Sequence, residues 1–214
     1  MKKTLLVSLL IFLFVSPSFA RAPFTEFKVG YLSPNDAKAG YLFGINLGRM
    51  IDESLSWSFD FNYFQKGYKK TTTVNKYKTP GGLEIEQVQR EMEFTTRIIP
   101  LFAKLNYEHP IGYKSPFYLR ASAGLGWELL WNKEDNYVDD VHKTRFFHGF
   151  GWQGSAGFGM EISSSANFFV DAIYNGSTVK RNKKTTELGL PTWEELDISG
   201  FGFRVGVSIV GFGW

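Results

Sequence analysis

Residues 117–131, with the sequence FYLRASAGLGWELLW, are the feature that most constrains the fold. Every second residue from Phe117 onward is apolar, and the residues between them are small, polar or charged as far as Glu128. Because side chains alternate between the two faces of a strand, this pattern indicates one long β-strand. An average strand has about 5–6 residues, whereas a transmembrane strand needs about 9–11 and has aromatic residues at its ends. The stretch therefore predicts a membrane-spanning strand.

The same alternation recurs along the chain. One apolar face and one small or polar face can be drawn for seven further segments, namely 25–33, 40–51, 55–64, 98–107, 146–162, 167–175 and 201–209. In the segment 98–107, Ile98 and Phe102 place apolar residues on the otherwise polar face, so its register is the least clear. The sequence predicts an all-β fold, an eight-stranded antiparallel up-and-down transmembrane β-barrel.

The connections between these segments alternate in kind. The second, fourth and sixth are tight, as in residues 52–54 and 163–165, and the fourth is a compact connection over 108–116. The others are polar and mostly long, with charged loops expected over 132–144 and 181–196. Residues 66–97 are expected to form a hairpin with its tip near Pro80. Short periplasmic turns and long extracellular loops are typical of outer-membrane barrels.

The polar face carries charges in the middle of the strands, which favours an interior of ionic groups and an exterior of apolar ones. A soluble barrel would place the apolar face inside instead, and a secreted soluble β-protein is the alternative that the period alone leaves open. An eight-stranded barrel has an interior that side chains just fill. We therefore expect a polar network in the lumen, formed by Lys28, Asp60, Lys104, Arg120, Glu128, Asp171 and Arg204, with Glu26 and Glu161 on the same face.

The N-terminal residues have the composition of a secretory signal peptide. Lys2 and Lys3 precede an apolar run, and Ser18 and Ala20 supply small residues for cleavage. We expect a signal peptide over residues 1–20 and a barrel domain over 21–214. The chain has no Cys, so the exported protein needs another source of stability, which a closed hydrogen-bonded barrel provides. A formal net charge of +3 gives no indication of a nucleic-acid surface.

The C-terminal residues Val210, Phe212 and Trp214 end the chain with alternating apolar side chains and a final aromatic. With the strand pattern, this ending resembles the OmpA/OmpX type of small outer-membrane β-barrel, and residues 97–105 resemble a strand of outer-membrane β-barrel domain proteins. The resemblance implies that the three residues are a signal for the barrel-assembly machinery. It also implies a location in the bacterial outer membrane. The apolar face up to Ile209 is out of phase with Trp214, which a bulge near Gly211 or Gly213 would reconcile.

Catalytic and cofactor sites have little support in the sequence. His109, His142 and His148 are the only histidines, and none has the spacing of a nucleophile and base or of a metal site. We expect no enzyme, no cofactor and no metal.

The expected role is structural or surface-interacting, with a lumen that side chains plug; a small porin-like channel for ions or small solutes is the alternative. Outer-membrane lipids are the expected partners. Lipopolysaccharide would meet the basic loop residues, and an extracellular partner could bind the hairpin near Pro80. The basic residues in question are Lys69, Lys70, Lys76, Lys78, Lys180, Arg181, Lys183 and Lys184.

Overall fold

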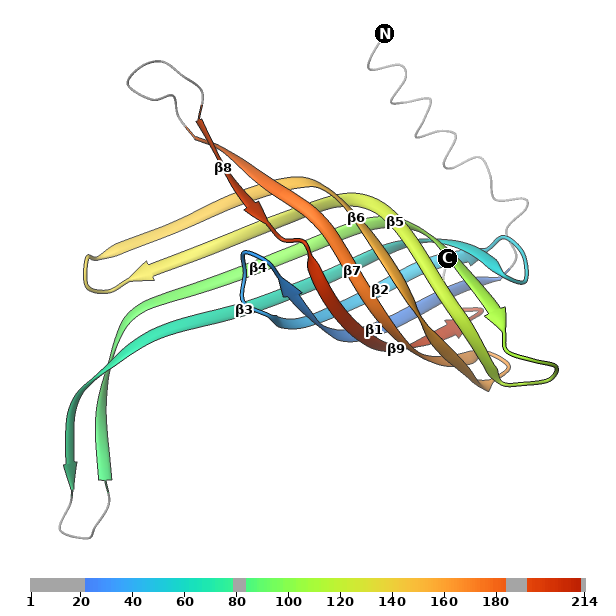
Figure 1. Ribbon diagram of the computed structural model, residues 1–214, viewed down its shortest axis with the longest axis horizontal. Coiled ribbons are helices and arrows are strands. Elements are labelled where there is room, and N and C mark those ends of the chain that lie inside the picture. The colour runs from blue at the N-terminus through green and yellow to red at the C-terminus, as the bar shows by residue number, and fades with distance from the viewer. Residues whose placement is uncertain (1–21, 79–83, 184–191, 213–214) are drawn as a thin grey trace.

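The computed structural model describes residues 22–78, 84–183 and 192–212, and within these ranges the chain is almost entirely β-strand (Figure 1). The strands are β1 (Pro23–Pro34), β2 (Gly40–Met50), β3 (Leu55–Lys78), β4 (Glu84–Pro110), β5 (Phe117–Asn136), β6 (Val141–Ser163), β7 (Ala166–Lys183), β8 (Thr192–Asp197) and β9 (Gly200–Val210).

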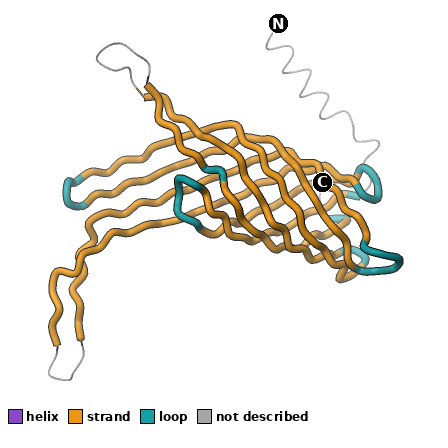
Figure 2. The backbone as a smooth tube through the Cα atoms, in the orientation of Figure 1, coloured by secondary structure: helices purple, strands orange, loops and turns teal. Residues whose placement is uncertain are grey.

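Eight of these strands close into a ring. Each strand from β1 to β7 pairs antiparallel with the next, β7 pairs with β9, and β9 pairs with β1. Strand β8 pairs with β7 alone and lies beyond the ring, where it prolongs β9 across a break at Ile198 and Ser199. The predicted eight-stranded antiparallel barrel is therefore confirmed, and the additional strand β8 extends the line of β9 beyond the ring (Figure 2).

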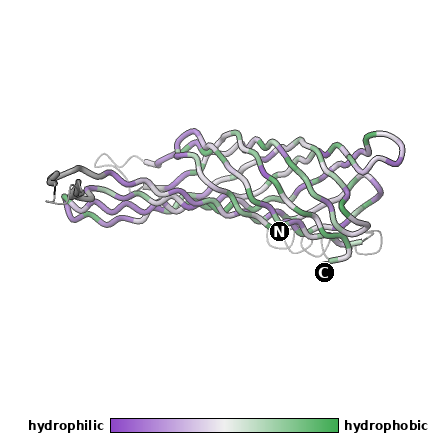
Figure 3. The backbone as a smooth tube through the Cα atoms, turned by 90° about the horizontal axis from the view of Figure 1, so that it is seen from below, coloured by the Kyte–Doolittle hydropathy of each residue, from purple (hydrophilic) through white to green (hydrophobic). Residues whose placement is uncertain are grey.

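The two faces of the barrel wall differ in exposure in the way that the alternation predicts. Along β5, Leu119, Leu125 and Trp127 are exposed on the outer face, whereas Arg120 and Glu128 are buried on the inner face. Hydrophobic and hydrophilic positions alternate through the barrel, and the hairpins at one end are mainly hydrophilic (Figure 3). Within the described residues there is no helix with the length and apolarity to cross a membrane.

Three connections are shorter than expected because the strands extend farther. The predicted charged loop 132–144 is mostly strand, since β5 runs to Asn136 and β6 begins at Val141. Opposite charges across the hairpin, such as Arg145 and Glu134 at 2.7 Å, support this pairing. The predicted loop 181–196 likewise contains the end of β7 and most of β8, and the fourth connection shortens to 111–116 because β4 runs to Pro110.

The expected assembly signal at the C-terminus lies partly within the described residues. Strand β9 ends at Val210, and Gly211 adopts a left-handed φ of 81° that breaks the strand register. Phe212 is exposed, and its backbone carbonyl accepts a hydrogen bond from Thr25. Trp214, the expected signal peptide over 1–20 and the hairpin tip at Pro80 lie outside the described residues.

Candidate functional site

Asp60 is the centre of an ion cluster inside the barrel. Its carboxylate pairs with Lys28 from β1 at 2.5 Å, with Lys104 from β4, and with Arg204 from β9 at 3.6 Å. All four side chains are almost inaccessible to solvent. Three cations from three different strands compensate the cost of burying the Asp60 carboxylate.

A second chain of ion pairs crosses the lumen. Arg204 donates to Asp171 at 3.0 Å, and Arg120 lies 3.2 Å from the other oxygen of Asp171. Arg120 also reaches Glu26 on the opposite wall at 2.8 Å, and Asn46 donates to the second oxygen of Glu26. With the Asp60 cluster, these contacts connect strands on every side of the ring.

Amide side chains extend this network toward the hairpin end. The Oε1 atom of Gln153 accepts hydrogen bonds from Lys104 and Arg204, and its amide nitrogen donates to Asn175 at 3.4 Å. Asn175 in turn donates to Glu128 at 2.8 Å. Among the described residues no Lys or Arg pairs with Glu128, which is only 1% exposed. Glu128 therefore joins the network through an amide rather than through Arg120 or Arg204.

Glu161, which the alternation also placed on the inner face, is solvent-exposed at the end of β6. It lies at the rim of the barrel, outside the buried network.

An apolar belt lies inside the barrel on the hairpin side of the network. Leu42, Phe64, Ile98, Leu130 and Phe147 are direct partners in turn along one row from β2 to β6. The row continues as a packed cluster on the remaining walls, with Leu32, Ile173, Val179 and Ile198. Ile98 thus lies inside the barrel as part of a continuous apolar layer. Sequence alternation treated it as an irregularity and missed the layer.

Aromatic rings occupy the lumen toward the short turns. Phe24, Tyr118 and Phe169 are buried there, and each faces a glycine of another strand. A Cβ atom at Gly48, Gly159 or Gly206 would overlap the ring of Phe24, Tyr118 or Phe169, respectively. The glycines on the inner face therefore make room for inward-pointing rings.

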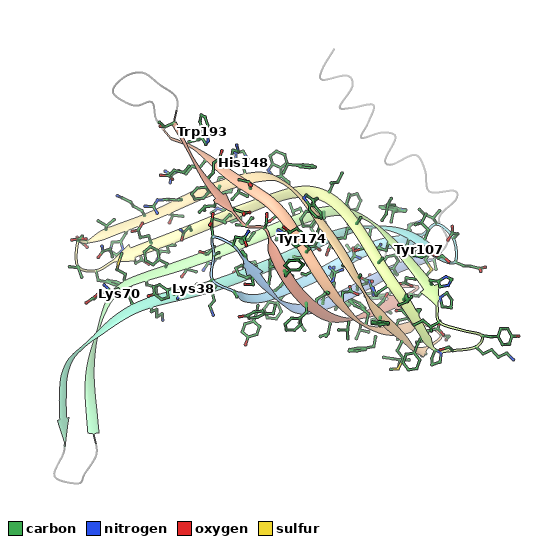
Figure 4. The ribbon with its side chains drawn as sticks, in the orientation of Figure 1. Lys38, Lys70, Tyr107, His148, Tyr174 and Trp193 are labelled. Atoms are coloured by element: carbon green, nitrogen blue, oxygen red, sulfur yellow. The ribbon has the colours of Figure 1, made fainter. Side chains whose placement is uncertain are left out.

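The outer surface carries aromatic side chains near both ends of the barrel. Tyr107 lies toward the short turns and His148 toward the hairpins (Figure 4). The imidazole of His148 stacks on Trp127 with centroids 5.9 Å apart, and Tyr107 stacks in the same way on His109 at 6.3 Å. Aromatic residues at two levels are typical of the membrane interfaces of a barrel.

The hairpins beyond the barrel carry cross-strand ion pairs. Lys70 pairs with Glu91 at 2.9 Å, and Lys180 pairs with Glu195 at 2.6 Å. Hydrogen bonding to Glu91 raises the pKa of Lys70, and hydrogen bonds from Lys180 and Trp193 lower the pKa of Glu195. Lys69 and Arg181 also have glutamate partners. Four of the eight basic side chains expected to contact lipopolysaccharide are thus engaged with carboxylates of the neighbouring strand, and the side chains of the other four, Lys76, Lys78, Lys183 and Lys184, lie outside the described part of the structure.

The histidines do not assemble a catalytic group. His142 accepts or donates one hydrogen bond with Asp135 at 2.7 Å, lies 3.6 Å from Asp140, and packs edge-on against Tyr137. His109 and His148 have the aromatic neighbours described above. Within the part of the chain that the structure describes, no group of three or more His, Asp or Glu residues is arranged to hold a metal ion.

The family comparison agrees with this architecture. Residues 6–208 match the model of the outer membrane protein beta-barrel domain. The chain belongs to this family. As a member of the outer membrane protein beta-barrel domain family, the protein is located in the bacterial outer membrane. Barrels of this membrane typically have short periplasmic turns and longer extracellular loops. The exposed apolar outer face contradicts the soluble alternative. A comparison with curated proteins gave no match.

Three solved structures illustrate the shared fold. Neisserial surface protein A is 14% identical with a TM-score of 0.51, covering 88% of this chain and 95% of that one. OprG from Pseudomonas aeruginosa is 14% identical with a TM-score of 0.53, covering 91% and 98%. A major outer membrane protein from Thermus thermophilus is 9% identical with a TM-score of 0.52, covering 89% and 100%. At these identities the likeness shows the fold alone.

Proposed function

We propose that this protein is a non-conducting outer-membrane barrel that serves as a rigid platform for the β3–β4 hairpin at the cell surface. The observation that carries the proposal is the ion-pair chain from Arg204 through Asp171 and Arg120 to Glu26, which spans the lumen. Opening an aqueous path would require these buried ion pairs to separate.

The apolar belt gives a second, independent barrier to ions. Phe64, Ile98 and Leu130 are each at most 1% exposed and belong to one packed cluster. An ion that passed them would lose its hydration without gaining a polar partner, which is costly. The belt and the network together support a lumen that side chains plug.

Planar-bilayer recording on the purified protein tests the proposal. The wild-type barrel should show no steady unitary conductance, and Phe64→Ala together with Ile98→Ala should produce brief openings by thinning the belt. The matched control is Phe61→Ala, which removes a lipid-facing ring from the same strand and should leave the barrel silent. Heat-modifiable migration on a gel verifies that each variant is folded. Steady wild-type channels would contradict the proposal.

A narrow cation channel is the second candidate, and Glu128 and Asn62 favour it. Among the residues that the structure describes, Glu128 is buried without a Lys or Arg partner, and both amide atoms of the buried Asn62 have no hydrogen-bond partner. These groups offer polar contacts beside the ion-pair network. If the wild-type protein conducts, Glu128→Gln should lower its selectivity for cations over anions.

The proposed partners of the protein are outer-membrane lipids, lipopolysaccharide and the barrel-assembly machinery. Outer-membrane lipids surround the apolar outer face, and we propose that lipopolysaccharide contacts this face more than the ion-paired hairpins. We also propose that Val210, Phe212 and Trp214 are read by the barrel-assembly machinery. We propose a structural or surface-interaction role rather than an enzymatic one, because the described residues contain no assembled nucleophile and base.

A further inference from the structure

The β3–β4 hairpin leaves two strand edges unpaired outside the barrel. The pairing of β2 with β3 ends at Tyr41 and Gln65, and the pairing of β4 with β5 ends at Met92 and Asn136. In the described residues beyond these points, β3 and β4 pair only with each other, as far as Lys78 and Glu84. Figure 1 shows this ribbon bending away from the barrel and beyond its width. Unpaired edges of this kind are templates for another strand.

The two strands of the ribbon have opposite net charge in the residues beyond their pairing with β2 and β5. Residues 66–78 of β3 contain five lysines, Lys66, Lys69, Lys70, Lys76 and Lys78, and no acidic residue. Residues 84–91 of β4 contain three glutamates, Glu84, Glu86 and Glu91, and one basic residue, and of these glutamates Glu91 already pairs with Lys70 inside the hairpin. Like edges therefore repel each other, whereas a β3 edge attracts a β4 edge.

We propose that the partner of this ribbon is a second copy of the chain, whose β3 edge adds to the β4 edge of the first. The membrane holds all copies with the same end outward. In a row of such copies β3 runs away from the membrane and β4 runs back, so the β4 edge of one copy meets the β3 edge of the next as an antiparallel pair. The contact is head-to-tail and can continue along a row of barrels. The inference rests on the proposed surface role of the hairpin.

Disulfide trapping between two differently tagged chains tests the contact. The chain has no Cys, so one chain carries Lys76→Cys and the other carries Glu86→Cys without background thiols. Lys76 and Glu86 are partners within one hairpin, and placing the cysteines on separate chains removes that intramolecular route. After oxidation in the outer membrane, the mixed dimer should exceed each homodimer at least several-fold.

The control is Asp139→Cys, at an exposed turn on the same side of the membrane, paired with Lys76→Cys. The amount of dimer that this control pair forms measures crosslinking by random collision. Adding Glu84→Lys to the Glu86→Cys chain should reduce the mixed dimer, and adding Lys78→Glu to the other chain should restore it. Heat-modifiable migration verifies that all chains are folded.

Mixed dimers at the control level, homodimers in equal amounts, or crosslinks only to other polypeptides would overturn the inference. This test fails separately from the proposed function, because bilayer recording reports on the lumen and disulfide trapping reports on the hairpin.

Discussion

The guanidinium group of Arg120 lies over the ring of Phe169, with its central carbon 3.8 Å from the ring centroid. The same guanidinium pairs with Glu26 and Asp171, so one side chain joins the aromatic layer to the ion-pair network. A desolvated cation–π contact contributes about 2 kcal/mol, and removing one partner of a buried ion pair costs about 3–5 kcal/mol. Arg120 therefore contributes to the stability of both layers.

The first prediction concerns this residue. Arg120→Met should lower the free energy of unfolding by about 3–5 kcal/mol, because it removes the cation that pairs with buried Glu26 and one of the two arginines that pair with Asp171. Phe169→Leu is the matched variant and should cost less, since it leaves the ion pairs in place. Urea unfolding in phospholipid vesicles measures both. A loss below about 1 kcal/mol for Arg120→Met would mean that the carboxylates find other partners.

A second prediction tests the orientation of the barrel wall. Leu125 is 59% exposed on the outer face near the middle of β5. Leu125→Arg should cost about 2–4 kcal/mol, because it places a charge in the hydrocarbon. Val138→Arg is the control, since Val138 is 67% exposed in the turn between β5 and β6, outside the membrane. Equal effects in the same unfolding measurement would argue against lipid contact at Leu125.

A third prediction uses the ring of Tyr118 and the glycine that it covers. A Cβ at position 159 would overlap the far end of the Tyr118 ring, and no backbone atom is among its nearest neighbours. Gly159→Ala should therefore cost about 1–3 kcal/mol through overpacking. In a chain that already carries Tyr118→Ala, most of this cost should disappear. A double-mutant cycle of unfolding free energies measures the coupling, and additive effects would rule out the overlap.

The two faces of each strand could be predicted from the sequence because lipid and lumen impose opposite polarity at adjacent positions. The alternation placed Lys28, Asp60 and Arg204 on the inner face, where the structure has them in contact. The actual partners could not be predicted, because they depend on the diameter and stagger of the closed ring. Glu128 illustrates this: its neighbour is Asn175 rather than an arginine.

The apolar belt was missed because alternation was used as the only criterion. At the belt, neighbouring residues are both apolar, as in Tyr63 and Phe64, Ile98 and Ile99, or Phe146 and Phe147. One residue of each pair faces lipid and the other faces the packed interior. Such doubled apolar positions near the same end of successive strands are a signal that could have revealed the layer. Residues 132–144 and 181–196 were predicted as loops, because cross-strand ion pairs replace the apolar pattern in this part of β5, β6, β7 and β8.

The last prediction concerns pH and the contact between the β1–β2 turn and the break between β8 and β9. Hydrogen bonds from Ser199 and then Asn35 lower the pKa of Asp197 below its usual range. A carboxylate with a lowered pKa stabilises the fold above its unfolded pKa, near about 3.9, and this contribution is lost as the pH falls through the folded value. NMR titration of the Asp197 carboxyl in wild-type protein should show the low value, and Ser199→Ala or Asn35→Ala should raise it. Because the backbone N–H groups of Asn35 and Asp36 bond to Ser199 and Asp197, acid should first loosen residues 35 and 36 while the barrel amides remain protected. Simultaneous exchange of loop and barrel amides on acidification would show that Asp197 does not control this contact.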